Sequence, residues 1–238
     1  MDQWNKTAQI FYDEYGHQKN STAFIRAYNR ILSRISFTIH NSQSTICVLD
    51  LGCGTGELAH ILAKAGFQVT GIDVSEKSLV KARALTPDAQ FLNADMTELP
   101  FEKFLFGGVF ALTSLEFCEK KKKVLSEIKR VLKPGGLFYV EVRNRDFILN
   151  FNHGRLGGFL TKLGLLKNYP AEDFQDLSHQ EWRQLFSESG FKIEREYASL
   201  RPWNYGNFLT RGKNLLIEFC KLVMPLRYQY MTAFLLHS

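Results

Sequence analysis

The chain has 238 residues, and its 30 Lys and Arg residues exceed its 24 Asp and Glu residues by six charges. This length suits one domain with small additions, and it excludes two independent domains. Hydrophobic residues make up 45% of the chain and aromatic residues 13%, which excludes a disordered or fibrous protein. The basic balance allows an anionic partner without requiring one.

Apolar residues recur at helical spacing between Trp4 and Phe37, which predicts two amphipathic helices joined around Gly16. After them, short apolar runs alternate with helical segments. We predict strands near 46–51, 67–73, 89–93, 107–113 and 136–143, with helices near 57–65, 75–85 and 118–132 between them. This alternation predicts a mostly parallel sheet covered by helices on both faces.

The last third opens on an irregular, glycine-rich and aromatic stretch, Phe151–Tyr169, of the kind that caps an active site. We then predict a helix near 179–189, a strand at 191–197, a helix at 207–223 and a closing strand at 228–236.

The cysteines are few and scattered, and no two of them form a C-x-x-C pair: Cys47, Cys53, Cys118 and Cys220. Neither a metal site nor a disulfide framework is predicted, so we expect a reduced, cytoplasmic protein. The first residues lack a basic segment followed by an apolar one, and charges interrupt every long apolar stretch. We therefore expect neither an export signal nor a membrane-spanning helix.

The most informative stretch is the apolar run that ends in Asp50 and continues into Gly52, Gly54 and Gly56. Glycine lets a backbone approach a ligand closely, and a helix start offers N–H groups without partners. A second strand ends on Asp73, where a carboxylate can accept from both ribose hydroxyls, and a third is followed by Asp95. Three carboxylates at three neighbouring strand ends predict one nucleoside site at that edge of the sheet.

A tight strand-to-helix turn would also use glycine, but the three acids make that explanation insufficient. A dinucleotide fingerprint needs its third glycine where Glu57 stands, so a nicotinamide oxidoreductase is disfavoured. No phosphate-binding P-loop motif occurs either. The acid beside the loop suits a cationic ligand better than a pyrophosphate.

From about Ile46 to Glu141 the chain resembles the class I S-adenosylmethionine-dependent methyltransferases. The glycine motif, Asp73, the segment Phe91–Met96 and the later segment Leu125–Gly136 match the family's motifs in order and spacing. The resemblance is strongest to the small-molecule and quinone-modifying branch, methyltransferase type 11. It implies an α/β Rossmann-like sheet in the order 3-2-1-4-5-7-6, with strand 7 antiparallel and helices on both faces.

The resemblance assigns the cofactor S-adenosylmethionine to residues of the first four strands and the first helix. Gly52, Gly54 and Gly56 would line its methionine part, and Asp50 would hold the loop or meet the amino group. Asp73 would bind the ribose. The adenine would meet Val74, Asp95 and Met96, the methionine would lie over Ala111 and Leu112, and Tyr12 would close over the cofactor, although a core tyrosine is an equal alternative.

The resemblance also implies one domain, 1–238. In it, residues 1–40 form a helical cap, and about 145–178 and 200–227 are cap insertions on the acceptor side. Two departures, Gly107-Gly108 at the start of strand four and Phe117 where relatives carry histidine, put borrowed acceptor chemistry in doubt.

A proton must leave an oxygen or carbon acceptor, and His153 and His179 are the candidate bases. His153 lies in the irregular segment where the acceptor would enter, whereas His179 fits a helix cap or surface residue better. Arg143, with Asn144, and Trp203 are candidates for acceptor binding, with structural pairing and ordinary packing as alternatives.

Two basic stretches are open to more than one interpretation. Lys120–Lys123 stands at the beginning of a predicted helix, and a solvated helix face explains it better than a nucleic-acid partner does. Residues 201–230 combine basic and apolar positions, which suits peripheral contact with an anionic membrane, an amphiphilic substrate, or a helix packed over the sheet edge. The oligomeric state is left open.

The sequence therefore predicts a methyltransferase that acts on a small, lipophilic or aromatic acceptor by in-line displacement. An RNA or protein methyltransferase is the nearest alternative, although the Asn/Asp-Pro-Pro-Tyr signature of nitrogen methylation is absent. A module that binds S-adenosylmethionine or S-adenosylhomocysteine without turnover is a third, because no obvious base is present.

Overall fold

A computed structural model describes residues 31–33, 35, 46–146, 177–198 and 231–238. The described fragment 31–33 and 35 is helical, within the span predicted for the N-terminal helices. The rest of that helical cap, the Phe151–Tyr169 stretch, the helix at 207–223 and the cap insertions at about 145–178 and 200–227 lie largely or wholly outside the described residues.

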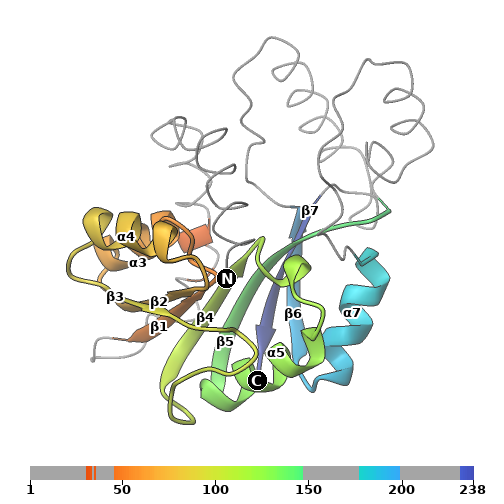
Figure 1. The fold of residues 1–238 in the computed structure, drawn as a ribbon. Helices are drawn as coiled ribbons and strands as arrows, with labels where there is room; N and C mark the ends of the chain where they lie inside the picture. The colour runs from red at the N-terminus through yellow and green to blue at the C-terminus, as the bar shows by residue number, and fades with distance from the viewer. Residues whose placement is uncertain (1–30, 34, 36–45, 147–176, 199–230) are drawn as a thin grey trace, which may run out of the picture.

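The core is a seven-stranded sheet in the order β3-β2-β1-β4-β5-β7-β6 (Figure 1). Strands β1 to β5 pair in parallel, and β7 runs antiparallel to both β5 and β6. The predicted strand order and the predicted antiparallel strand are confirmed. The strands are β1 (Cys47–Leu51), β2 (Gln68–Asp73), β3 (Gln90–Asn93), β4 (Phe106–Leu112), β5 (Leu132–Arg143), β6 (Lys192–Ala198) and β7 (Met231–His237).

Helices cover both faces of the sheet, as predicted (Figure 1). The described helices are α3 (Glu57–Lys64), α4 (Glu76–Leu85), the 3-10 turn η2 (Leu115–Phe117), α5 (Lys121–Val131) and α7 (His179–Glu188). Apolar residues of α5 and α7 pack with Phe138 and Val140 on one face, and those of α3 and α4 pack with Leu137 and Tyr139 on the other. Successive residues of β5 therefore point to opposite cores, as a pleated strand requires.

Two boundaries differ from the sequence prediction. Helix α5 begins at Lys121 rather than near 118, because residues 115–117 form the separate turn η2. Strand β5 begins at Leu132 rather than near 136, because Leu132 already pairs with Phe106 before the register shifts.

The lysine run is only partly a solvated face. Lys121 is buried, its Nζ donates to the carbonyl of Cys118 at 2.7 Å, and it lies 5.8 Å from the centre of the Trp182 ring. Lys122 is exposed and pairs with Glu188. The interpretation as a wholly solvated run was therefore wrong for Lys121, whose side chain joins α5 to α7.

Helix α7 is anchored to the end of β5 by its first turn. Ser178 caps the helix in a reciprocal capping box with Glu181, as the sequence predicted for a polar residue before a helix. The Nε1 of Trp182 donates to the carbonyl of Arg143 at 3.0 Å, and the Trp182 ring stacks on Phe186. These contacts fix the place where the chain returns to the sheet after β5.

In the described part of the chain, no helix is long and apolar enough to cross a membrane.

Replacing Trp182 with Phe is expected to lower the free energy of unfolding by about 1–3 kcal/mol, because the Arg143 carbonyl loses its donor and a small cavity forms. Chemical denaturation measures this change. The exposed residue Gln184 on the same helix provides the control, and Gln184→Ala is expected to cost less than about 0.5 kcal/mol. Equal effects of the two changes would contradict the anchoring role of Trp182.

Candidate functional site

The loop between β1 and α3 is a left-handed backbone turn that is tied to the next strand. Its glycines have positive φ angles of 73°, 53° and 82° at Gly52, Gly54 and Gly56. The N–H groups of Gly52 and Cys53 both donate to the carbonyl of Ile72 at 2.9 Å. The loop leaves β1 and is therefore also held by hydrogen bonds to the carboxyl end of β2.

The three glycines have different structural roles. A Cβ at Gly52 would lie 2.5 Å from the Cβ of Ser114, and one at Gly56 would lie 2.8 Å from the Cβ of Ala82. At Gly54, by contrast, no atom of the described residues comes within 4 Å of an added Cβ. Gly52 and Gly56 thus allow close packing, whereas Gly54 faces open space that a ligand can fill.

Asp73, at the end of β2, joins the glycine loop to the turn that follows β2. Its Oδ2 accepts from the Gly54 N–H at 2.9 Å, and its Oδ1 accepts from the Ser75 N–H at 2.8 Å. Burial raises the pKa of this carboxyl group above its ordinary value, and the backbone hydrogen bonds from Ser75, Gly54 and Val74 oppose that rise. A carboxylate has about four acceptor sites, so both oxygens retain capacity for ribose hydroxyls.

The electrostatic field at the loop is negative. Burial raises the pKa of the Cys53 thiol well above its ordinary value, and the nearby carboxylates of Asp50, Asp73 and Glu57 raise it further. Asp50 itself is only 3% exposed and pairs in the sheet with Gly71 and Phe110. A site that disfavours a thiolate also disfavours a phosphate and favours a cation.

Asn93 is a site residue that the sequence reasoning missed. Its side-chain amide donates to the carbonyls of Asp73 and Val74, at 3.3 and 3.0 Å. It thereby holds the backbone next to Val74, one of the predicted adenine contacts. The signal was available, because Asn93 ends β3 beside Asp73 in the parallel register.

Asp95 and Met96 follow β3 in the irregular segment that leads to β4. The Oδ1 of Asp95 accepts from the Thr97 N–H at 2.7 Å, which makes a tight turn around Met96. Met96 is half-buried, and its methyl group lies 3.8 Å from the position of a Cβ on Gly52. The structure therefore places Met96 next to Gly52 of the glycine loop, and its predicted contact with the adenine stays a prediction.

The end of β4 reaches the same loop from the other side. Ala111 and Leu112 are buried, and they belong to opposite cores. Thr113 then adopts a positive φ of 54°, which is rare for a β-branched residue. The Ser114 Oγ donates to the Leu51 carbonyl at 2.8 Å. Thr113 and Ser114 were missed, although two small polar residues directly after a central strand were a usable signal.

Three predicted site residues lie outside the described residues: Tyr12, which was expected to close over the cofactor, and His153 and Trp203 on the acceptor side. Arg143 ends β5, where its carbonyl accepts from Trp182. The Asn144 Oδ1 accepts from the N–H groups of His179 and Asp146, both at 3.1 Å, so this side chain stabilises the turn into α7 rather than standing free for an acceptor.

His179 is neither an exposed cap residue nor an evident base. It is buried as the first residue of α7, its ring stacks on Phe234, and its Nε2 lies 2.9 Å from a carboxylate oxygen of Glu196. Burial lowers the pKa of the ring, Arg183 lowers it further, and Asp146 opposes both. The sequence interpretation of His179 as a cap or surface residue was therefore wrong about its exposure, because α7 packs this face against β6 and β7.

Together, β1, β2 and β3 present Asp50, Asp73 and Asp95 at or next to their carboxyl ends, in adjacent positions of one sheet. The open Gly54 position follows Cys53, whose thiol is close enough to the carboxylates of Asp50, Asp73 and Glu57 for them to raise its pKa beyond the effect of burial. Such a site can receive a cationic nucleoside, which is the chemical character of S-adenosylmethionine.

Comparison with known proteins agrees with this arrangement. Residues 49–140 match the family described as a methyltransferase domain. The malonyl-[acyl-carrier protein] O-methyltransferase of Buchnera aphidicola subsp. Baizongia pistaciae is 33% identical over 148 residues, which are 62% of this chain and 58% of that protein. The demethylmenaquinone methyltransferase of Chlorobaculum tepidum is 29% identical over 157 residues, 61% of this chain and 65% of that protein. The chain thus spans less than two thirds of these relatives.

A solved structure shows the same fold. The 1,6-didemethyltoxoflavin-N1-methyltransferase of Burkholderia thailandensis, with bound 1,6-didemethyltoxoflavin and S-adenosylhomocysteine, superposes with a TM-score of 0.61 at 14% identity, over 98% of this chain and 85% of that one. The strand order, the glycine loop and the family match confirm the predicted resemblance. Residues 49–140 thus match a methyltransferase domain, and the chain is similar to small-molecule and quinone-modifying members of the class I S-adenosylmethionine-dependent methyltransferases.

Proposed function

We propose that this protein transfers a methyl group from S-adenosylmethionine to a small acceptor of lipophilic or aromatic character. The observation that carries the proposal is the glycine loop, where Gly54 faces open space while its N–H is held by Asp73. A cationic donor suits the negative surround of this loop, whose carboxylates raise the pKa of Cys53.

The donor would lie across the carboxyl ends of β1 to β4. In this proposal the methionine part lies along Gly52, Gly54 and Gly56, over Ala111 and Leu112, and Asp50 meets its amino group or holds the loop. Asp73 accepts from the ribose. The adenine contacts Val74, Asp95 and Met96, and Tyr12 closes over the cofactor.

The chemistry asks little of the protein beyond alignment. The bond from the methyl carbon to sulfur breaks as the bond to the acceptor nucleophile forms, and the sulfonium becomes a neutral thioether. Holding the two reactants in line and keeping water out lowers the barrier. An oxygen or carbon acceptor also loses a proton, for which His153 is the proposed base.

The acceptor would enter from the side on which β5 ends. Residues 1–40, about 145–178 and 200–227 would cap that side within one domain, and Arg143 and Trp203 would contact the acceptor. The names of two relatives support a small acceptor or one on a carrier, since they specify demethylmenaquinone and a malonyl-[acyl-carrier protein]. We place the reaction in the cytoplasm, where scattered free cysteines such as Cys47 and Cys118 stay reduced.

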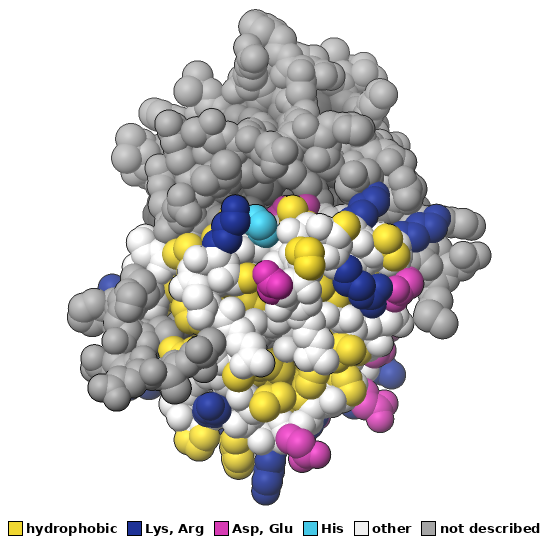
Figure 2. Space-filling model, turned by 90° about the vertical axis from the view of Figure 1, so that its left-hand side faces the viewer, with side chains coloured by type: hydrophobic (Ala, Val, Ile, Leu, Met, Phe, Trp, Pro, Cys, Tyr) yellow, Lys and Arg dark blue, Asp and Glu magenta, His cyan; other side chains and the backbone are white. Residues whose placement is uncertain are grey.

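The described surface gives little support to a nucleic-acid acceptor. On the face at the β3 edge, Lys and Arg side chains lie among Asp and Glu side chains rather than in one continuous basic area (Figure 2). A nucleic-acid substrate needs clustered positive charge. The proposal therefore keeps a small molecule as the first choice.

Replacing Gly54 with Ala is expected to weaken binding of S-adenosylmethionine at least about tenfold, because the added methyl group enters the space assigned to the donor. The positive φ adds only about 1–2 kcal/mol of strain, so the protein stays folded. Isothermal titration calorimetry measures the affinity. Gly56→Ala is the matched variant: its methyl group would meet Ala82, so unfolding becomes easier by about 2 kcal/mol or more. Unchanged affinity in Gly54→Ala would exclude the assigned contact.

The affinity for S-adenosylhomocysteine is expected to fall as the pH is lowered from neutral into the acid range, because Asp73 must be ionised to accept from the ribose. Its raised pKa places this loss at a higher pH than an ordinary aspartate would. In Asp73→Asn the affinity at neutral pH is expected to be lower by about tenfold or more, and the acid limb should disappear. If the affinity of Asp73→Asn for S-adenosylhomocysteine still falls at low pH, a group other than Asp73 causes the pH dependence.

Incubation with S-adenosylmethionine labelled in its methyl group and with fractionated cell extract tests the reaction itself. We expect label in a lipid or small-molecule fraction. Label in RNA or protein would replace the small acceptor with a macromolecule. Tight donor binding without label in any fraction would instead indicate a module that binds the donor without turnover.

A further inference from the structure

The segment between β3 and β4 has neither helix nor strand over residues 94–105, yet it carries Asp95 and Met96. Irregular backbone needs partners for its N–H and C=O groups, and those partners decide how firmly the segment is held. Some of these partners lie in the segment itself and in β2, and four contacts come from α5, within the segment Leu125–Gly136 that the family resemblance named but the donor site did not use.

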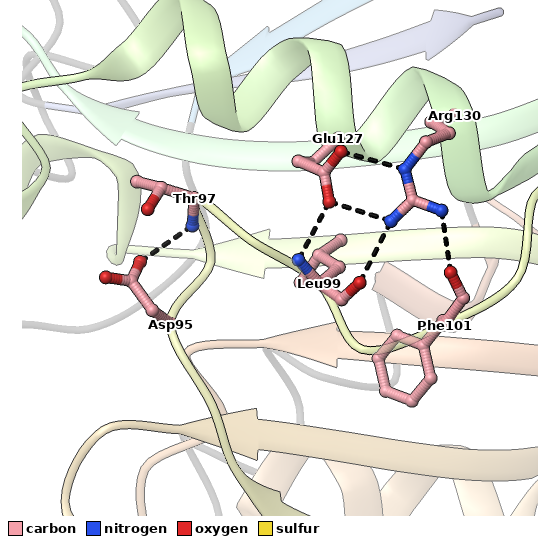
Figure 3. A network of polar contacts seen from close by, with 6 residues as sticks. All are labelled: Asp95, Thr97, Leu99, Phe101, Glu127 and Arg130. Carbon is pink, nitrogen blue, oxygen red and sulfur yellow. Dashed lines mark hydrogen bonds and ion pairs between the residues drawn. The ribbon is translucent and has the colours of Figure 1, made fainter.

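The side chains of Glu127 and Arg130, both on α5, form hydrogen bonds with the backbone of the segment (Figure 3). The Glu127 Oε2 accepts from the Leu99 N–H at 2.8 Å. The Arg130 guanidinium donates from Nη2 to the Leu99 carbonyl at 2.9 Å and from Nη1 to the Phe101 carbonyl at 2.6 Å. The backbone of α5 adds a fourth contact, because the Phe104 N–H donates to the Arg130 carbonyl at 3.0 Å.

The two side chains also fix each other. Arg130 Nε lies 2.8 Å from Glu127 Oε1 and Nη2 lies 2.7 Å from Oε2, which is a bidentate pair. Such a pair holds its geometry better than a single contact does. The hydrogen bond from Arg130, the Leu99 N–H and the neighbouring cations hold the pKa of Glu127 below its usual range, although burial opposes them. The pair is therefore charged at neutral pH.

The held positions are close to the adenine contacts. Leu99 is only 4% exposed and follows Met96 by three residues, and the turn in which Asp95 accepts from Thr97 fills the gap between them. The Phe101 ring packs edge-on against Phe106 at the start of β4, with ring centres 5.1 Å apart. A shift of the backbone at Leu99 would move Asp95 and Met96 with it.

We propose that Glu127 and Arg130 are positioning residues of the donor site. By holding the backbone at Leu99 and Phe101, they fix the positions of Asp95 and Met96 relative to the adenine. The inference rests on the proposed function. It adds that selectivity for the adenine base depends on side chains that touch neither donor nor acceptor.

The test compares two ligands that differ only at the purine edge assigned to Asp95. S-adenosylhomocysteine carries a 6-amino donor, whereas S-inosylhomocysteine carries a 6-oxo acceptor that a carboxylate repels. We expect wild-type protein to prefer the first by at least about tenfold in calorimetry. Arg130→Lys keeps the charge but loses the fork, and it is expected to reduce this preference at least about threefold.

Glu127→Gln is the second variant, because its amide oxygen can still accept from Leu99 while the charged pair is lost, and the same direction of change is expected. Lys129→Met is the matched control on the same helix, since Lys129 Nζ donates to the Gly190 carbonyl at 2.9 Å, away from the segment. A purely stabilising role of the pair would leave the ratio of the two affinities unchanged in all three variants.

The outcomes separate the two proposals. An unchanged ratio in both Arg130→Lys and Glu127→Gln, with S-adenosylhomocysteine still bound, overturns the positioning role and leaves the proposed function standing. A reduced ratio in Lys129→Met that equals theirs overturns it as well, because the effect would then be general. Wild-type protein that binds neither ligand would overturn the proposed function, and the inference with it.

Discussion

The described site depends on one half-buried carboxylate, that of Asp73. Asp73 accepts from the Gly54 N–H with one oxygen and from the Ser75 N–H with the other, so a single side chain links the turn after β1 to the turn after β2. Both backbone donors are directed at a group whose burial costs free energy when it is charged, as its raised pKa indicates. That cost is offset only while both turns keep their geometry. The shape of the glycine loop and the ionisation of Asp73, the proposed ribose-binding group, therefore depend on each other.

This mutual dependence explains why the backbone of the glycine loop is fixed although one side of Gly54 faces open space. Gly54 has no described neighbour on the side of an added Cβ, which would leave most loops free to move. Its N–H is nevertheless fixed by Asp73, the preceding N–H groups are fixed by Ile72, and Ser114 holds the Leu51 carbonyl from β4. The loop is thus anchored on the sheet side and exposed on the other. A preformed surface of this kind does not have to be ordered when a ligand binds.

The sequence predicted the features that depend on local residue patterns, such as strands, helices and the glycine loop. It did not predict contacts between residues that are distant in the chain. Alternating strands and helices predicted a mostly parallel sheet, and the family resemblance supplied its strand order. The glycines and the strand-end acid predicted the loop and the place of Asp73 beside it, whereas Met96 came from the resemblance alone. The hydrogen bonds of Glu127 and Arg130 to Leu99, the burial of His179 against Glu196 and the position of Lys121 beside the Trp182 ring could not be foreseen. Each depends on how a helix packs against a segment elsewhere in the fold. Asn93 and Ser114 lie between these cases: their place at strand ends was visible, but their partners were not.

The same division separates the donor half of the molecule from the acceptor half. The described contacts of the proposed donor site come from β1 to β4, the turns that follow these strands, α4 and α5, where hydrogen bonds and packed side chains determine positions closely. At the end of β5, by contrast, Asn144 and Trp182 are committed to holding α7, and His179 is committed to Glu196. Polar groups that already serve the scaffold cannot also be varied to suit a new acceptor. In the proposed function, acceptor recognition would therefore rely mainly on the chain between β5 and α7 and between β6 and β7, which is consistent with one fold serving relatives with different acceptors.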